Sequence, residues 1–179
     1  MPRKPDPALE EKIIDAAVQL LDSQGMDAIT MREVAKAART TTPTIYERFR
    51  DHEAILWAVF QRVRLDLLPR MEKARTLPSM ADDFLQYVCD HPQRLELLHR
   101  VWPPLLGTNE PQPIFELAIR RLRNEYGHSP KKAEEISFAL ITQLLGTAIL
   151  MLGAGLGTAS AKAIQAAGQR AYRRLAEGI

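Results

Sequence analysis

Apolar residues recur every three or four positions along almost the whole chain, and no stretch shows the alternation with a period of two that marks a half-buried strand. This pattern predicts an all-α protein of about nine helices. We expect the helices at about residues 7–24, 31–38, 42–49, 52–68, 79–90, 92–102, 114–126, 130–152 and 159–177.

Several helix ends carry recognisable start and stop signals. Asp6 and Pro7 suit an N-cap and first helical position, and Gly25 suits the residue after a helix. Thr30 begins the sequence TMRE, which predicts a capping box in which Thr30 and Glu33 satisfy each other's backbone N–H groups. Asp51 is expected to cap the fourth helix, and Pro69 to end or kink it.

Residues 40–50, TTTPTIYERFR, form an unusually polar short helix with a proline at its start. Threonine and proline are poor helix-interior residues, but proline fits the first turn. Threonine hydroxyls can bond phosphate oxygens or base edges, and a tyrosine hydroxyl one turn later could reach a phosphate, although Tyr46 could equally be a packing residue. Two helices within residues 30–49, joined by about three residues, have helix-turn-helix spacing.

Charge supports this interpretation only locally. The whole chain carries a formal net charge of +2, whereas residues 31–50 hold five Lys/Arg and two Glu. Such a segment is typical of an anion-binding surface, and a solvated helix face is the alternative.

Composition argues against several other classes of protein. Cys89 is the only cysteine, so the chain forms no internal disulfide, which favours a reducing compartment. Residues 1–11 have no apolar signal-peptide core. We therefore expect a cytoplasmic protein. The four histidines (His52, His91, His99 and His128) match no zinc-binding spacing, and no Gly-rich phosphate loop or nucleophile elbow is present. We therefore expect no metal, no cofactor and no enzymatic activity.

Residues 136–161 contain no charge and are long enough to cross a bilayer. However, three glycines end the predicted helix early and polar residues dilute it, so we expect no membrane span. A helix this apolar on all sides should be buried on more than one face. We therefore expect a homodimer joined by the last two helices as a four-helix bundle. The interface residues we expect are Leu140, Leu144, Ala148, Met151, Ala163, Ala167 and Ala171.

The N-terminal segment resembles the DNA-binding domain of the tetracycline-repressor (TetR) family of bacterial transcription regulators. The resemblance covers about residues 12–59 and lies in the motifs "VAKAA" and "PTIYERF", the threonine that opens the second helix, and the acidic residue before the fourth. It implies a DNA-binding domain at 1–51, with the helix-turn-helix at 30–49, and a helical effector-binding and dimerisation domain at 52–179.

The resemblance also implies roles for individual residues. Thr42, Pro43 and Thr44 would face bases and backbone, Tyr46 would bond a phosphate, and Thr41 would cap the recognition helix or donate to a phosphate. Arg32 and Arg48 would lie near the DNA. The residues expected to contact DNA are therefore Arg32, Arg39, Thr41, Thr42, Pro43, Thr44, Tyr46, Arg48 and His52.

Two positions depart from the family's pattern. Arg39 stands where the family usually has a glycine, and a left-handed backbone there would cost an arginine about 1 kcal/mol unless the turn differs or a DNA contact offsets the strain. His52 stands where the family commonly has a phosphate-contacting lysine. Because histidine gains charge as the pH falls, we expect operator affinity to rise between pH 8 and pH 6.

These features predict a homodimeric repressor that an apolar or aromatic small-molecule effector releases from a palindromic double-stranded operator. The alternative is a helical small-molecule-binding protein or enzyme without specific DNA binding, which would lack salt-dependent affinity for DNA. The effector-pocket candidates, each equally suited to a plain core, are Phe60, Phe84, Tyr87, Cys89, Trp102, Phe115, Thr142 and Gln143.

Overall fold

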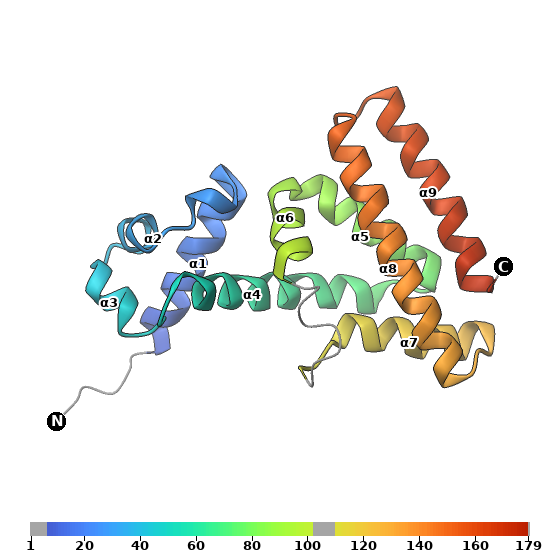
Figure 1. Cartoon of the computed structure of the whole chain (residues 1–179), viewed down its shortest axis with the longest axis horizontal. Coiled ribbons are helices and arrows are strands. Elements are labelled where there is room, and N and C mark those ends of the chain that lie inside the picture. Colours follow the sequence, from blue (N-terminus) through green and yellow to red (C-terminus); the bar gives the residue numbers. More distant parts are fainter. Residues whose placement is uncertain (1–6, 102–109, 179) are drawn as a thin grey trace. The chain divides into compact units, whose positions relative to one another are not determined.

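The computed structural model describes residues 7–101 and 110–178, which are helical throughout apart from short connections and contain no strand. The predicted all-α fold is confirmed (Figure 1). The elements are α1 (Pro7–Gln24), the 3-10 helix η1 (Met26–Ala28), α2 (Met31–Ala37), α3 (Thr42–Tyr46), α4 (His52–Lys73), α5 (Leu77–Asp90), α6 (Pro92–Val101), α7 (Pro113–Tyr126), α8 (Pro130–Gly153) and α9 (Ala159–Glu177). The Asp6 cap and Trp102 lie outside the described residues.

Side-chain caps start the helices at the predicted places, with one correction. The Ala54 N–H donates to Asp51 at 2.9 Å, and the Glu33 N–H donates to the Thr30 hydroxyl at 3.2 Å. The reciprocal half of the predicted capping box is not formed, because the Thr30 N–H donates instead to the Ala28 carbonyl at 2.9 Å. The 3-10 turn before α2 supplies this nearer acceptor.

Two helix boundaries differ from prediction. α3 ends at Tyr46 rather than near residue 49, although the Phe49 N–H still donates to the Ile45 carbonyl at 2.9 Å. α4 continues past Pro69 to Lys73, so of the two predicted effects of Pro69, ending or kinking the helix, the first is wrong. Proline removes the donor to the carbonyl of Leu65, and Leu65 is 64% exposed, so water can reach this turn and the loss is tolerated.

The described residues pack as two compact units. One contains the described chain up to Leu65 together with residues 91–101, and in it α6 packs on α1. The other contains residues 66–90 and 110–178. The predicted division into functional domains at residues 51 and 52 stays a prediction, since these units are defined by packing alone.

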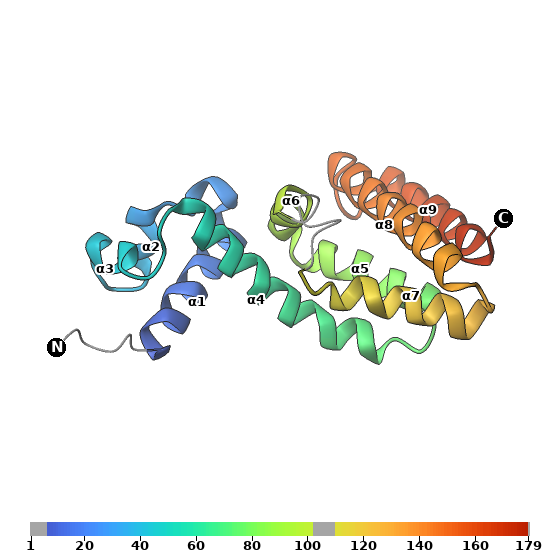
Figure 2. The same ribbon diagram turned by 60° about the horizontal axis from the view of Figure 1, so that its bottom comes forward.

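In the second unit α8 and α9 lie side by side, and α5 and α7 pack against them (Figure 2). Gln143 of α8 donates from Nε2 to the Gly168 carbonyl of α9 at 2.8 Å. Gln169 of α9 donates to Asp82 of α5 at 2.7 Å. These amide side chains fix the register of the three helices.

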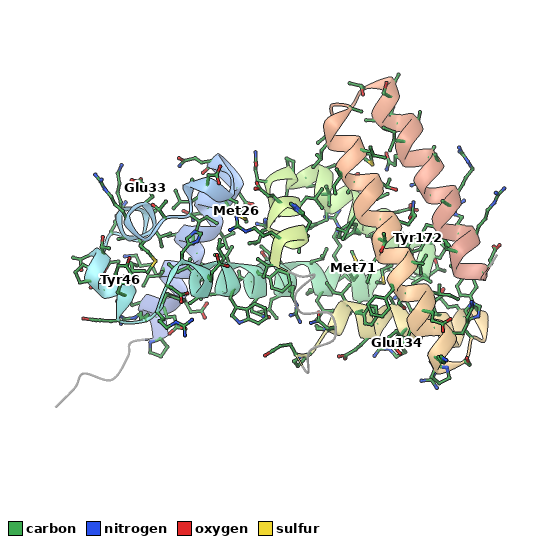
Figure 3. All side chains as sticks on the ribbon, viewed as in Figure 1. Met26, Glu33, Tyr46, Met71, Glu134 and Tyr172 are labelled. Carbon is green, nitrogen blue, oxygen red and sulfur yellow. The ribbon has the colours of Figure 1, made fainter. Side chains whose placement is uncertain are left out.

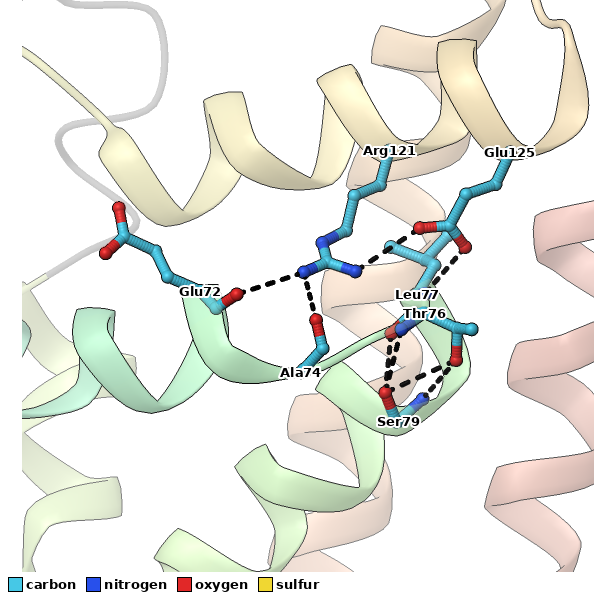
Figure 4. Close-up of polar contacts among 7 residues, drawn as sticks. All are labelled: Glu72, Ala74, Thr76, Leu77, Ser79, Arg121 and Glu125. Atoms are coloured by element: carbon cyan, nitrogen blue, oxygen red, sulfur yellow. Dashed lines mark hydrogen bonds and ion pairs between the residues drawn. The ribbon is translucent and has the colours of Figure 1, made fainter.

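Arg121 of α7 closes the junction between α4 and α5 (Figure 4). Its guanidinium donates to the carbonyls of Glu72 and Ala74, and also contacts Glu125 at 3.3 Å. Glu125 in turn accepts from the Leu77 N–H at 2.8 Å. The carbonyls at the end of α4 and the first N–H of α5 are thereby satisfied by one pair of side chains.

By length and composition α8 could cross a membrane, since its mean hydropathy over 18 residues is 1.9. Core helices of soluble proteins pass the same test. One side of α8 is buried in its own unit, and this side includes three of the predicted interface residues: Leu140, Ala148 and Met151. Leu144 is half-buried, whereas Ala163, Ala167 and Ala171 on α9 are exposed.

Candidate nucleic-acid interface

The core of the first unit holds α2 and α3 in place while leaving their polar sides in solvent. Val34 and Ala35 of α2, Ile45 of α3 and the following Phe49 are buried against this core. Arg32 and Thr41 point away from it and are exposed. The short turn between the helices therefore presents the start of α3 outward, as a helix-turn-helix does.

The turn between α2 and α3 depends on a left-handed residue at Arg39, whose φ is +54°. Among the described residues it is the only one other than glycine with a positive φ. The Arg39 N–H donates to the Lys36 carbonyl at 3.1 Å, and the Thr40 N–H donates to the Ala35 carbonyl at 2.9 Å. These two bonds form a Schellman motif, which requires the left-handed conformation at this position.

Thr41 organises the first turn of α3. Its hydroxyl accepts from the Thr44 N–H at 3.4 Å and lies 2.9 Å from the Thr44 hydroxyl. Pro43 is exposed, and Thr42 is half-buried. Tyr46, at the last position of α3, is 55% exposed (Figure 3). The tip thus displays two hydroxyl-bearing side chains, a rigid proline ring and a phenol, all of which can contact a duplex.

A groove of about 650 Å³ opens beside this tip. Four residues expected to contact DNA line it together: Arg32 of α2, Thr42 and Tyr46 of α3, and His52 at the start of α4. The remaining lining residues are Met26, Asp27, Thr30, Met31 and Arg100. The first unit thus gathers the predicted cationic and hydroxyl groups of three helices on one concave surface.

Arg48 and His52 make internal contacts that the sequence did not reveal. The Arg48 side chain is only 11% exposed and donates to the Thr44 carbonyl at 3.4 Å, so in the free protein it supports the end of α3. The Nε2 atom of His52 lies 2.6 Å from the Ile29 carbonyl. A DNA contact by either residue stays a prediction.

Arg100 is the groove residue that sequence reasoning missed. It stands in the last turn of α6, 51 residues after the end of the helix-turn-helix, and no local motif marks it. Its guanidinium lies 3.8 Å from the Glu53 carboxylate. The packing of α6 on α1 and η1 brings it to the groove.

The predicted effector residues do not form one described cavity. Phe60 and Tyr87 are buried, and Phe115 packs on Phe138 with ring centroids 4.8 Å apart. The Thr142 hydroxyl donates to the Phe138 carbonyl at 2.9 Å, and Gln143 bridges α8 and α9. Phe84 and Cys89 are half-buried, and burial raises the pKa of the Cys89 thiol. A pocket role for these residues stays a prediction.

Within residues 7–101 and 110–178, no three His, Cys, Asp or Glu side chains are grouped as metal ligands would be.

Comparisons with known proteins agree with this geometry. Residues 13–59 match the family model described as bacterial regulatory proteins, tetR family. The tetracycline repressor protein class E of Escherichia coli is 28% identical over 115 residues, which are 63% of this chain and 53% of the repressor. The chain thus spans about half the length of this relative.

Solved structures share the fold across nearly the whole chain. A TetR variant from Acinetobacter baumannii AYE in complex with minocycline has a TM-score of 0.73 at 24% identity, covering 98% of this chain and 96% of that one. A tetR-family transcriptional regulator from Streptomyces coelicolor has a TM-score of 0.70 at 19% identity, covering 96% and 81%. At these identities the likeness concerns the fold.

The fold and the exposed tip define a helix-turn-helix protein followed by a helical second unit. The match over residues 13–59, which run from α1 into the first half of α4, makes the class specific: this segment is similar to the bacterial regulatory proteins of the tetR family.

Proposed function

We propose that this protein is a transcriptional regulator that binds a palindromic operator as a homodimer and is released from it by a small-molecule effector. The observation that carries the proposal is the shared groove, which Arg32, Thr42 and Tyr46 line together beside the tip of α3. Cationic and hydroxyl donors on one concave surface suit a phosphate backbone, and the tip of α3 suits the edges of bases.

The proposed dimer uses the exposed side of α8 and α9. Ile149 is 49% exposed and Leu150 is 61% exposed, and Leu156 in the following turn is 39% exposed. The small exposed residues Ala163, Ala167 and Ala171 lie on α9. Large apolar side chains beside small ones allow two helix pairs to approach closely as a four-helix bundle.

The proposed effector is apolar or aromatic and binds in the helical region after residue 51. The A. baumannii TetR variant is described in complex with minocycline. We propose repression rather than activation, and cytoplasmic residence without a membrane-bound state, on the same family grounds. An effector can release DNA only if it binds the DNA-free arrangement more tightly than the DNA-bound one.

Thr44 provides the test of this function. A duplex enriched by the wild-type protein from a random-sequence library serves as the probe, and binding is measured by fluorescence anisotropy at several salt concentrations. Thr44→Ala should weaken binding to this duplex by about 1–3 kcal/mol if Thr44 contacts a base, and should leave binding to a scrambled duplex unchanged. Thr76→Ala, which alters an exposed threonine in the second unit, is the matched control.

The alternative, a helical enzyme or small-molecule-binding protein, predicts a different result. It would give weak duplex affinity and no enrichment of one sequence over another. A wild-type protein without a steep inverse dependence of affinity on salt would refute the regulatory function.

A further inference from the structure

The groove beside the recognition tip contains a cation that does not come from the helix-turn-helix. Arg100 lies in the last turn of α6, whereas Arg32, Thr42 and His52 come from α2, α3 and α4. These residues line the same surface within the first compact unit. A ligand that fills the groove therefore meets polar side chains from four helices rather than three.

The donors of Arg100 are not committed to a protein acceptor among the described residues. Its only ion-pair partner there is Glu53, and the separation of 3.8 Å between Arg100 Nη2 and Glu53 Oε1 is too long for a hydrogen bond. The Arg100 side chain is 51% exposed. A weak, solvated pair of this kind contributes little to folding and leaves the guanidinium able to bind an anion.

Glu53 has a second side chain beside it, since the Nδ1 atom of His52 lies 3.8 Å from Glu53 Oε1. Its carboxylate thus stands next to both Arg100 and His52 at the edge of the groove. Asp27 adds one more carboxylate to the lining. Any phosphate that approaches Arg100 competes with Glu53 for the same charge.

We propose that Arg100 is a DNA phosphate contact supplied by α6, and that Glu53 opposes it by neutralising the guanidinium in the free protein. This inference rests on the proposed function, because it concerns the same groove. Arginine suits the role, since its planar fork of donors matches phosphate oxygens and stays charged at all relevant pH values. Duplex binding exchanges the long contact with Glu53 for hydrogen bonds to a phosphate.

The test uses the full chain and the duplex enriched by the wild-type protein. Affinity is measured by fluorescence anisotropy from low to high salt for Arg100→Gln, Arg100→Lys, Glu53→Gln and the control Arg120→Gln, whose side chain is exposed on α7 in the second unit. Thermal denaturation of each variant reports folding separately.

Arg100→Gln should weaken duplex binding about tenfold, since a hydrogen bond to a charged group is lost in each protomer. The slope of log affinity against log salt should become shallower by about 2 for a dimer that loses two phosphate contacts. Arg100→Lys should keep the wild-type slope. Glu53→Gln should strengthen binding about threefold, because it removes a charge that repels the phosphate. The control Arg120→Gln should match the wild type in affinity and slope.

An Arg100→Gln protein with the wild-type affinity and slope would overturn the inference. A loss of affinity with an unchanged slope would also overturn it, because that pattern indicates a folding defect. Inorganic phosphate alone could raise the melting temperature of the wild type but not that of Arg100→Gln, while the two proteins bind the duplex equally. That result would mean that Arg100 binds a free anion, and it would refute the DNA contact. Failure of the wild type to bind any duplex would instead refute the proposed function.

Discussion

The imidazole of His52 is hydrogen-bonded to the backbone of Ile29, with 2.6 Å between Nε2 and the carbonyl oxygen. The contact joins the first residue of α4 to the residue just before the Thr30 cap of α2. It spans 23 residues of sequence and closes the loop that contains the whole helix-turn-helix. His52 therefore holds the two ends of the DNA-binding motif together.

His52→Ala should lower the free energy of unfolding by about 1–3 kcal/mol, because the Ile29 carbonyl loses its donor in a partly buried site. Urea denaturation monitored by circular dichroism measures this change. His99→Ala, which alters an exposed histidine of α6 whose Nδ1 atom lies 3.3 Å from the Leu95 carbonyl, is the control for the loss of an imidazole.

The same variant separates positioning from direct phosphate contact. If His52 only positions α4, duplex affinity falls while the salt slope stays that of the wild type. If its Nδ1 atom also reaches a phosphate when protonated, wild-type affinity rises from pH 8 to pH 6 and the trend disappears in His52→Ala. A pH trend that persists in His52→Ala would rule out the phosphate contact.

Arg39 should favour duplex binding and lower the free energy of unfolding. Its left-handed backbone costs a non-glycine residue about 1 kcal/mol, and no ion pair or hydrogen bond of its side chain within the described residues offsets that cost. Arg39→Gly should raise the free energy of unfolding by about 0.5–1 kcal/mol and weaken duplex binding.

Arg39→Ala provides the matched comparison, because alanine removes the charge but keeps the strain. Both variants should lose the same salt-dependent affinity, and only the glycine variant should gain stability. Equal stability of the two variants would show that the turn is not strained at this residue.

Lowering the pH should destabilise the first turn of α4, because it protonates the Asp51 carboxylate that caps this helix. The hydrogen bond from the Ala54 N–H, followed by the interaction with Arg50, holds the pKa of the Asp51 carboxyl below its usual value of 3.8. A carboxyl whose pKa is lowered by folding stabilises the protein above its unfolded pKa, and this contribution is lost as the pH falls through the lowered folded value.

Asp51→Asn keeps a side-chain oxygen for the Ala54 N–H but does not titrate. The difference in melting temperature between wild type and Asp51→Asn should therefore be constant above pH 5 and shrink below about pH 4. A difference that stays constant down to pH 2 would contradict the assigned role of the carboxylate.

A dimer through α8 and α9 should be sensitive to charge on their exposed apolar side. Leu150→Glu places a carboxylate at a residue that is 61% exposed in the single chain, so folding should survive while association fails. Sedimentation velocity at micromolar concentration measures the result. Leu65→Glu, at a residue that is 64% exposed on α4, should remain dimeric if the interface is confined to α8 and α9.

Most helix starts and their side-chain caps could be predicted because their signals are local. Thr30 and Asp51 cap their helices through residues only three positions away, and Gly127 ends α7 with a φ of +70°. A left-handed backbone at Arg39 was one of two alternatives left open by the sequence, and it came from the glycine in the family's pattern rather than from a local signal.

Contacts between distant segments could not be read from the sequence. The approach of Arg100 to Glu53 depends on how α6 packs on α1, which no local pattern encodes. Gln143 was expected near an effector, but its amide also suits the Gly168 carbonyl of a neighbouring helix, and only the packing distinguishes these partners. Leu140 and Met151 illustrate the same limit, since apolar residues suit a protomer core as well as an interface.

The close packing of α8 on α9 should depend on the absence of a side chain at Gly168. A Cβ atom there would overlap the hydroxyl and methyl groups of Thr147, whose hydroxyl also contacts Gln143 at 2.9 Å. Gly168→Ala should therefore lower the free energy of unfolding by about 1–3 kcal/mol, as overpacking does, even though alanine favours helix. Adding Thr147→Ala to Gly168→Ala should restore much of the lost stability. The control is Gly146→Ala, because a Cβ added there meets no atom within 4 Å. It should be neutral or stabilising in the same urea titrations. A Gly168→Ala protein as stable as Gly146→Ala would show that the two helices do not approach this closely.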